Sequence, residues 1–194
     1  MTSILEVEQL DTLSSNASST LTIGGTNTTT IAFGPNVTTT PSSLANTPMF
    51  HTYLSAHQTV SHNTFTKFQG NVVVKDTDSA YDNTTNYRWT CPSGKGGTYL
   101  FWWNLFIHYS GNTITNDLAV LRKNGSTIAG TQNNNGVNVN DGSLLMVPIS
   151  GTFVVDVSAG DYIELFGYGS TSNSGNFLFI SSSLGWGGMK VIGA

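Results

Sequence analysis

The stretch Thr98-Tyr-Leu-Phe-Trp-Trp-Asn-Leu-Phe-Ile-His-Tyr109 decides the fold of this chain. Successive side chains of a β-strand point to opposite faces, so the odd and even positions of this stretch lie on different faces. From Tyr99 to His108 the odd positions are apolar or aromatic throughout, and the even positions are apolar at all but Asn104 and His108. The pattern therefore predicts a long strand whose two faces are both buried. The odd positions are Tyr99, Phe101, Trp103, Leu105 and Ile107, and the even positions are Leu100, Trp102, Asn104, Phe106 and His108.

The even face of this strand needs a cover. A solitary two-layer sandwich would show one polar face, and leaving apolar side chains in water forgoes about 1.5–3 kcal/mol for each Leu or Phe. The simplest way to bury the even face is contact with another subunit. The alternative is that a loop of the same chain covers this face. We therefore predict an intersubunit interface formed by Leu100, Trp102, Phe106 and His108.

The composition of the whole chain favours an all-β protein. Only 9% of its 194 residues are charged, against roughly 25% in an ordinary soluble domain. With 38% hydrophobic and 11% aromatic residues, the chain is too apolar for wholesale disorder. Its polarity comes from Ser, Thr and Asn, which compete with helical hydrogen bonds, while Val, Ile, Phe and Tyr suit a pleated sheet.

From Pro48 onward, runs of β-type residues alternate with turn signals, which is the pattern of a sandwich or barrel. Asn124-Gly125 predicts a two-residue hairpin, because both central positions of a type I′ turn need positive φ. Gln132–Gly136 and Ser170–Asn176 are predicted to be exposed loops, since they offer no apolar area to bury. The expected strands are Met49–Ser55, Thr64–Val74, Tyr87–Cys91, Thr98–Tyr109, Leu118–Lys123, Ser143–Val147, Thr152–Val157, Tyr162–Tyr168 and Phe177–Ser183, with Met189–Ile192 as a closing strand.

Residues 1–47 differ from the rest, because their only aromatic residue is Phe33 and they cannot build a core alone. Within them Thr20-Leu-Thr-Ile-Gly24 recurs as Thr30-Ile-Ala-Phe-Gly34. Each copy alternates apolar and polar residues and ends at Gly, which predicts short strands that bury their apolar face against copies from other chains. The alternative is a Thr/Asn-rich linker. We therefore divide the chain into an N-terminal arm, residues 1–47, and a knob domain, residues 48–194.

Charge and cysteine content exclude several partners. The net charge is −4 and the seven basic residues are scattered, so no basic stripe exists for nucleic acid. Cys91 is the sole cysteine, which excludes an intrachain disulfide framework and a Cys-based zinc cluster. The start of the chain lacks a basic leader, and no window approaches the ~18 apolar residues of a membrane span. We expect no membrane insertion.

Signals for an enzyme are sparse. The chain has four histidines but no His-Glu-x-x-His, Gly-x-Ser-x-Gly or Ser-x-x-Lys motif. Asp76, Asp78 and Asp82 offer oxygen ligands for calcium, but the EF-hand spacing and its closing Glu are missing, and we interpret them as turn formers. We expect no catalytic residue, no cofactor and no metal site.

A series of motifs runs through the C-terminal part of the chain: Tyr87-Arg-Trp-Thr-Cys-Pro92, Gly97-Thr-Tyr-Leu-Phe101, Leu118-Ala-Val-Leu-Arg-Lys-Asn-Gly125, Phe153-Val-Val-Asp-Val-Ser-Ala-Gly-Asp-Tyr-Ile-Glu-Leu165 and Phe177-Leu-Phe179. In this order and spacing they resemble the C1q/tumour-necrosis-factor-like jelly roll as it appears in bacteriophage virion proteins. The likeness covers residues 48–194. It implies a jelly-roll sandwich that assembles as a compact homotrimer.

The segment near the start of the chain reads Ile4-Leu-Glu-Val-Glu-Gln-Leu-Asp-Thr-Leu13, and it is followed by the Thr-Ile-Gly-type repeats. This N-terminal segment resembles the short anchoring arms of marine phage structural proteins. This likeness implies that the arm attaches the protein to the capsid or virion. An arm of about 47 residues is a stub, which fits a decoration protein or head fibre better than a long tail fibre. The implied attachment residues are Ile4, Leu5, Val7, Leu10 and Leu13.

We therefore predict a non-enzymatic structural protein located in the virion, a homotrimeric capsid decoration or short head-fibre protein whose partners are other capsid or tail proteins. One alternative is the receptor-binding knob of a phage tail fibre that recognises a host surface glycan. Another is a soluble C1q-like binding module. For recognition, the candidate residues are Asn133, Asn134, Asn135, Ser172, Asn173 and Trp186. Trp186 stands among glycines, and its alternative interpretation is a core residue.

Overall fold

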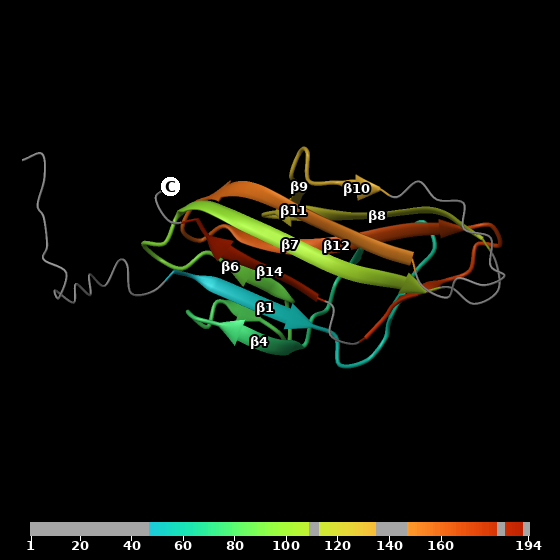
Figure 1. The fold of residues 1–194 in the computed structure, drawn as a ribbon, viewed down its shortest axis with the longest axis horizontal. Helices are drawn as coiled ribbons and strands as arrows, with labels where there is room; N and C mark the ends of the chain where they lie inside the picture. Colours follow the sequence, from blue (N-terminus) through green and yellow to red (C-terminus); the bar gives the residue numbers. More distant parts are fainter. Residues whose placement is uncertain (1–46, 109–112, 135–146, 182–184, 192–194) are drawn as a thin grey trace, which may run out of the picture. The chain divides into compact units, whose positions relative to one another are not determined.

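The computed structural model describes residues 47–108, 113–134, 147–181 and 185–191. All regular structure in these residues is β-strand, arranged in two antiparallel sheets (Figure 1). The all-β prediction is therefore confirmed. The predicted arm, residues 1–47, lies outside the described residues except for Thr47.

Sheet A has β7 at its centre. The strand order is β2-β13-β7-β14-β1-β4, and β11 pairs with the opposite edge of β7 from Val147↔Ile107 to Val157↔Gly97. β13 and β14 share the other edge of β7. The strands are β1 (Met49–Tyr53), β2 (Gln58–Val60), β4 (Val72–Asp76), β7 (Gly97–His108), β11 (Val147–Val157), β13 (Phe177–Phe179) and β14 (Gly185–Lys190).

Sheet B is built on the long pair β8 and β12. Its strand order is β10-β8-β12-β6-β5, with β3 paired to β12 and β9 paired to β8. The strands are β3 (Thr66–Lys67), β5 (Tyr81–Asp82), β6 (Arg88–Thr90), β8 (Ile114–Lys123), β9 (Ser126–Thr127), β10 (Asn133–Asn134) and β12 (Tyr162–Thr171).

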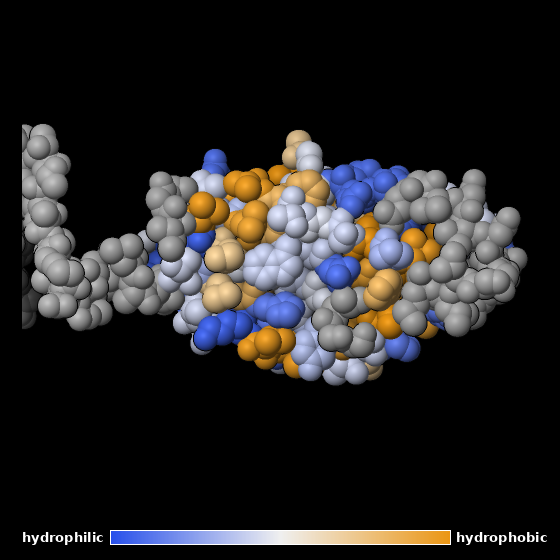
Figure 2. All heavy atoms as spheres, viewed as in Figure 1, coloured by the Kyte–Doolittle hydropathy of each residue, from blue (hydrophilic) through white to orange (hydrophobic). Residues whose placement is uncertain are grey.

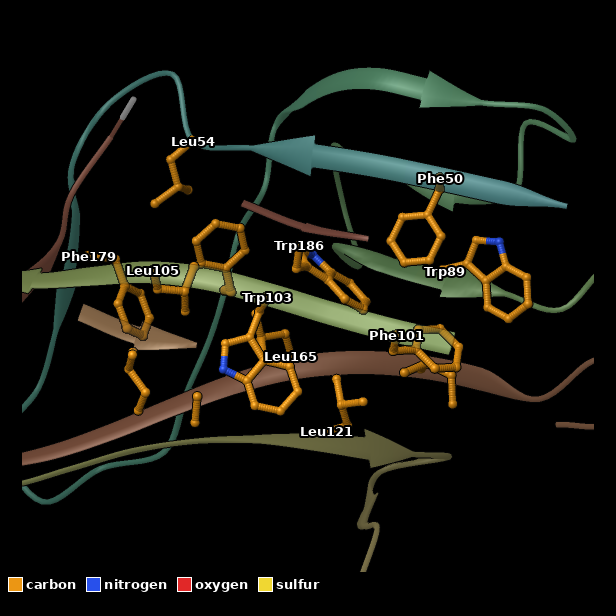
Figure 3. Close-up of a cluster of buried hydrophobic side chains, with 14 of the residues drawn as sticks. Phe50, Leu54, Trp89, Phe101, Trp103, Leu105, Leu121, Leu165, Phe179 and Trp186 are labelled. Atoms are coloured by element: carbon orange, nitrogen blue, oxygen red, sulfur yellow. The ribbon is translucent and has the colours of Figure 1, made fainter. Parts of the chain in front are cut away.

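The core lies between the two sheets and is rich in aromatic rings (Figure 3). All five odd positions of β7 face it and are at most 2% exposed, as the alternation predicts. Phe50 from β1 packs edge-on against Trp186 from β14, with ring centroids 4.7 Å apart. Burying side chains of this size contributes about 1.5–3 kcal/mol each, which makes the core the main source of stability.

Glycines make room for several of these rings. A Cβ on Gly167 of β12 would lie 2.1 Å from the Phe179 ring. A Cβ on Gly151 of β11 would lie 2.5 Å from Trp103, whose ring stacks on Phe153 at 5.1 Å. β11 runs through Gly151, so it extends further toward the N-terminus than the strand expected at Thr152–Val157, while the strand expected at Ser143–Val147 lies outside the described residues except for Val147.

The predicted hairpin at Asn124-Gly125 is confirmed. The two residues have φ of 52° and 81°, and Lys123 pairs with Ser126 across the turn. In contrast, the single strand expected at Thr64–Val74 is wrong, because the chain forms β3, turns near Gly70 and forms β4 in the other sheet. Gly70 is buried against Thr52, where a Cβ would lie 2.6 Å from the Thr52 hydroxyl oxygen.

The hairpin is tied to the Gly160-Asp161 turn by a polar clamp. Asn124 donates through Nδ2 to Asp161 Oδ1 at 2.7 Å, and its Oδ1 accepts the Tyr162 N–H at 2.9 Å. Asp161 Oδ2 accepts the Ser158 N–H at 2.9 Å. The backbone hydrogen bond from Ser158 and the Asn124 amide lower the pKa of Asp161, and Lys123 adds to this effect. The clamp therefore favours the ionised carboxylate.

We expect Asp161→Asn to lower the Tm at pH 7 by about 2–4 °C, corresponding to about 1 kcal/mol. A carboxyl whose pKa is lower in the folded state stabilises above its unfolded pKa, near 3.9, and loses that contribution as pH falls through its folded value. The difference between variant and wild type should therefore shrink in thermal scans from pH 6 down to about pH 2.5.

The matched control is Asp156→Asn on β11. The Asp156 carboxylate accepts a hydrogen bond from the Thr98 hydroxyl at 2.6 Å, which an amide oxygen can also accept. We expect its Tm to change by less than about 2 °C. A deficit in Asp161→Asn that stays constant with pH would show that the carboxylate charge is not what stabilises the clamp.

Candidate functional site

The strongest functional feature of the described residues is the outer face of sheet A, the face turned away from the core. Strand pairing builds this face from four strands. Leu100 of β7 lies beside Met189 of β14 on one side and Val154 of β11 on the other. Trp102 lies beside Gly187 of β14, which pairs in turn with His51 of β1. Residues far apart in the sequence thus form one continuous surface.

This face carries exposed apolar side chains in the single chain. Val154 is 62% exposed and Met189 is 37% exposed, and Trp102 is half-buried. Figure 2 views the molecule from the side on which β1, β7 and β11 lie, and shows hydrophobic spheres gathered over β11 and over both ends of β7. Exposed apolar patches of this kind mark interaction sites in soluble proteins.

Trp102 occupies the middle of the face. A Cβ on Gly187 would lie 2.6 Å from Trp102 Cζ2, so the indole lies directly against the glycine backbone. The His51 ring is 6.4 Å from the Trp102 ring, centroid to centroid. Burial lowers the pKa of His51, so its imidazole is neutral at pH 7. The centre of the face is therefore apolar and uncharged.

The structure places the predicted interface residues together. Leu100, Trp102, Phe106 and His108 all lie on the outer face of β7, and each is half-buried in the single chain. Sequence reasoning missed the contributions of His51, Val154 and Met189. The sequence could have indicated Val154, because it is an apolar residue between the inward-facing Phe153 and Val155 and therefore lies on the outer face of β11.

The residues predicted for attachment and recognition do not form one common site in the described residues. The attachment residues Ile4, Leu5, Val7, Leu10 and Leu13 lie outside the described residues, as does Asn135. Ser172 and Asn173 are exposed in the turn after β12. The loop predicted at Asn133 and Asn134 is wrong, because these residues form β10 and pair with Ala119 and Leu118 of β8.

Trp186 requires a correction. Its side chain is fully buried, between Phe50 and Tyr81 in the core, so it is not a surface recognition residue. The reason is the approach of β14 to β1, where a Cβ on Gly185 would lie 1.9 Å from the Thr52 carbonyl oxygen. The glycines around Trp186 allow close strand packing, and the indole points inward (Figure 3). Trp186 is therefore a core residue, which was the alternative interpretation of its place among glycines.

His57, His62 and Asp82 bind backbone groups. His57 Nδ1 accepts the Ser181 N–H at 2.8 Å, and His62 Nδ1 accepts the Thr171 N–H at 3.1 Å. Asp82 accepts the N–H groups of Thr84, Thr85 and Asn86, which lower the pKa of its carboxyl. These contacts fit structural roles in turns and loops.

The described residues hold no group of three or more His, Cys, Asp or Glu side chains placed to bind a metal ion. Cys91 is buried, and burial raises the pKa of its thiol, which is the opposite of what an activated nucleophile needs. No helix within the described ranges is long and apolar enough to cross a membrane.

The two antiparallel sheets packed around one core define the class of the domain, a jelly-roll sandwich. Among solved structures, the globular domain of zebrafish complement 1qA protein is 14% identical and has a TM-score of 0.51, over 74% of this chain and 97% of that chain. This similarity shows that the domain has the jelly-roll fold of the C1q globular domain. The predicted all-β jelly-roll sandwich is therefore confirmed, while the N-terminal arm of short β repeats and the trimeric state stay predictions.

Two further solved structures are similar in fold. Eiger TNF from S. frugiperda has a TM-score of 0.49 at 15% identity, over 76% of this chain and 93% of that chain. Murine APRIL at pH 8.5 has a TM-score of 0.47 at 13% identity, over 75% of this chain and all of that chain. No family model and no curated protein matches the sequence.

Proposed function

We propose that this chain is a non-enzymatic structural protein that assembles as a homotrimer through the outer face of sheet A. The observation that carries the proposal is the apolar face centred on Trp102, with Val154 and Met189 left exposed in the single chain. Covering such a surface is favourable by about 25 cal/mol per Å² of apolar area, and the neutral His51 adds no charge that would oppose contact.

The chemistry of the described residues supports a structural rather than a catalytic role. A hydrolytic or transfer enzyme needs a nucleophile next to a general base, or a bound metal. Here Nδ1 of both His57 and His62 is bound to a backbone N–H, and the Cys91 thiol is buried. Low charge also makes the surface insensitive to ionic strength, which suits a particle component.

The particle is proposed to be a phage virion, with the protein as a capsid decoration or short head fibre. The support is the resemblance of the sequence to phage proteins of this type and the apolar spacing of residues 4–13.

The deciding experiment compares binding to empty capsids with binding to host cells. Capsid binding alone supports this proposal. Cell binding alone would favour the receptor-binding knob, and binding to neither would favour a C1q-like module unconnected to a virus.

Deletion of Met1–Leu13 is expected to reduce particle association at least tenfold, while the Tm of the knob domain changes by less than about 2 °C. The reason is that the deleted segment carries the apolar residues proposed for attachment, whereas the core of the described residues is built from side chains between Phe50 and Trp186. Association is measured by co-sedimentation with particles that lack the protein.

The matched control replaces polar residues of the same segment. A variant with Glu6, Glu8 and Gln9 changed to Ser should bind particles nearly as well as wild type, whereas Ile4, Leu5 and Val7 changed to Ser should not. A truncated protein that still decorates particles would refute attachment through the arm.

A further inference from the structure

A cavity of about 480 Å³ lies beside β2, and the core residue Leu54 contributes to its wall. Its walls come from the segment after β1, from the chain around β3 and from Tyr87 before β6. Its size falls in the range of pockets that hold small ligands, about 300–1,000 Å³. The side chains that give it its chemical character are Leu54, His57, Gln58, Gln69, Asn71 and Tyr87.

Two amide side chains in the cavity are held in place from both ends. Gln58 donates through Nε2 to the Lys67 carbonyl at 2.6 Å, and its Oε1 accepts the Gln69 N–H at 2.9 Å. Asn71 accepts the Ser55 N–H through Oδ1 at 2.9 Å and donates through Nδ2 to Ser55 Oγ at 2.8 Å. These bonds join the cavity walls, so binding a ligand requires little further ordering of the protein.

The donors of the cavity are neutral. His57 Nδ1 accepts a backbone N–H, so this nitrogen carries no proton and the neutral ring carries its proton on Nε2. Within the described residues, the side-chain amide of Gln69 has no hydrogen-bond partner and remains free to donate and accept. The nearby Lys67 ammonium is bound to Glu164 at 2.5 Å and to the Asn86 carbonyl at 3.0 Å.

Tyr87 supplies an aromatic wall in an unusual backbone conformation. Its φ is 48°, in the left-handed region that a bulky residue rarely adopts. Strain of this kind persists at binding sites where a side chain must be held in one place. Tyr87 and the buried Leu54 are the aromatic and the large aliphatic residue of the cavity lining, and they complement its amides.

We propose that this cavity binds a neutral sugar unit. A sugar ring offers hydroxyls to amide and imidazole donors and acceptors, and an apolar C–H face that stacks on an aromatic ring. Among the described residues, no Lys or Arg lines the cavity to hold an anionic ligand, and no carboxylate lines it to hold a cation. The lining of this site includes no residue of the exposed turn at Ser172–Asn176 and none of the predicted interface residues of β7.

The test is saturation-transfer NMR and calorimetry on the full chain with glucose, galactose, mannose, N-acetylglucosamine and their disaccharides at up to about 50 mM, a concentration that detects millimolar binding. We expect at least one of them to bind with a Kd in the low millimolar range, since one cavity makes few contacts. Gln69→Ala should weaken binding at least tenfold with Tm unchanged. Tyr87→Gly should abolish binding without loss of fold, because glycine adopts this φ freely.

The matched control is Gln132→Ala, an exposed amide elsewhere on the chain, which should bind as wild type does. Absence of binding by every sugar at the highest concentration overturns the proposal, as does binding that both cavity variants retain. Tighter binding of sialic acid or of an extended peptide than of neutral sugars also overturns it. Sedimentation of the same variants tests assembly separately, so failure here leaves the homotrimer proposal intact.

Discussion

Trp102→Asp should convert the protein from a trimer of about three times 20.7 kDa into a folded monomer at micromolar concentration. The Trp102 side chain lies at the centre of the outer face of sheet A, against Gly187 and beside His51. In a homotrimer the carboxylate introduced in each subunit would be buried in an apolar contact without a partner, and an unpaired buried charge costs several kcal/mol. Sedimentation velocity measures the mass, and circular dichroism measures whether the fold survives.

The control for this prediction is Phe65→Asp. Phe65 is 40% exposed and packs against Tyr168 of sheet B, so the variant introduces the same charge at an exposed aromatic outside the outer face of sheet A. We expect it to remain trimeric with a lower Tm. The assembly proposal is refuted if the wild-type protein is a folded monomer at micromolar concentration. It is also refuted if the Trp102→Asp variant remains a trimer.

The alternation in residues 98–109 was sufficient to predict the centre of the fold. Side-chain direction in a strand depends only on the parity of the position, so Tyr99 and Phe101 reach the core and Leu100 and Trp102 the outer face whatever strands pair with β7. The hairpin at Asn124-Gly125 was predictable for a similar reason, because its backbone requirement is local.

The features that could not be predicted from the sequence are those that depend on which strands pair and in which register. β10 is two residues long and exists because Asn133 and Asn134 pair with β8, which no local pattern indicates. The outer face likewise depends on register, since Met189 lies beside Leu100 only because β14 runs along β7 in that alignment. The proposed sugar cavity depends on turns that bring Gln58 and Gln69 together.

Trp186 illustrates how the same local sequence fits two opposite environments. A tryptophan among glycines suits an exposed loop, where it can stack on a ligand, and it suits a strand packed so closely that only glycine fits beside its neighbours. The distance between β14 and β1 decides between them, and it leaves no space for a Cβ at Gly185. Burial of this indole is therefore a consequence of strand packing.

Trp186→Ala is accordingly expected to destabilise the folded chain by about 3–5 kcal/mol, because it removes a fully buried indole that contacts Phe50 and Tyr81 and leaves a cavity that the glycine-lined strand cannot fill. Urea unfolding followed by circular dichroism measures the change. Phe65→Ala, which truncates a 40% exposed ring, should cost about 1 kcal/mol or less. If Trp186→Ala unfolded at the wild-type urea concentration and lost only ligand binding, the indole would be a recognition residue and not a part of the core.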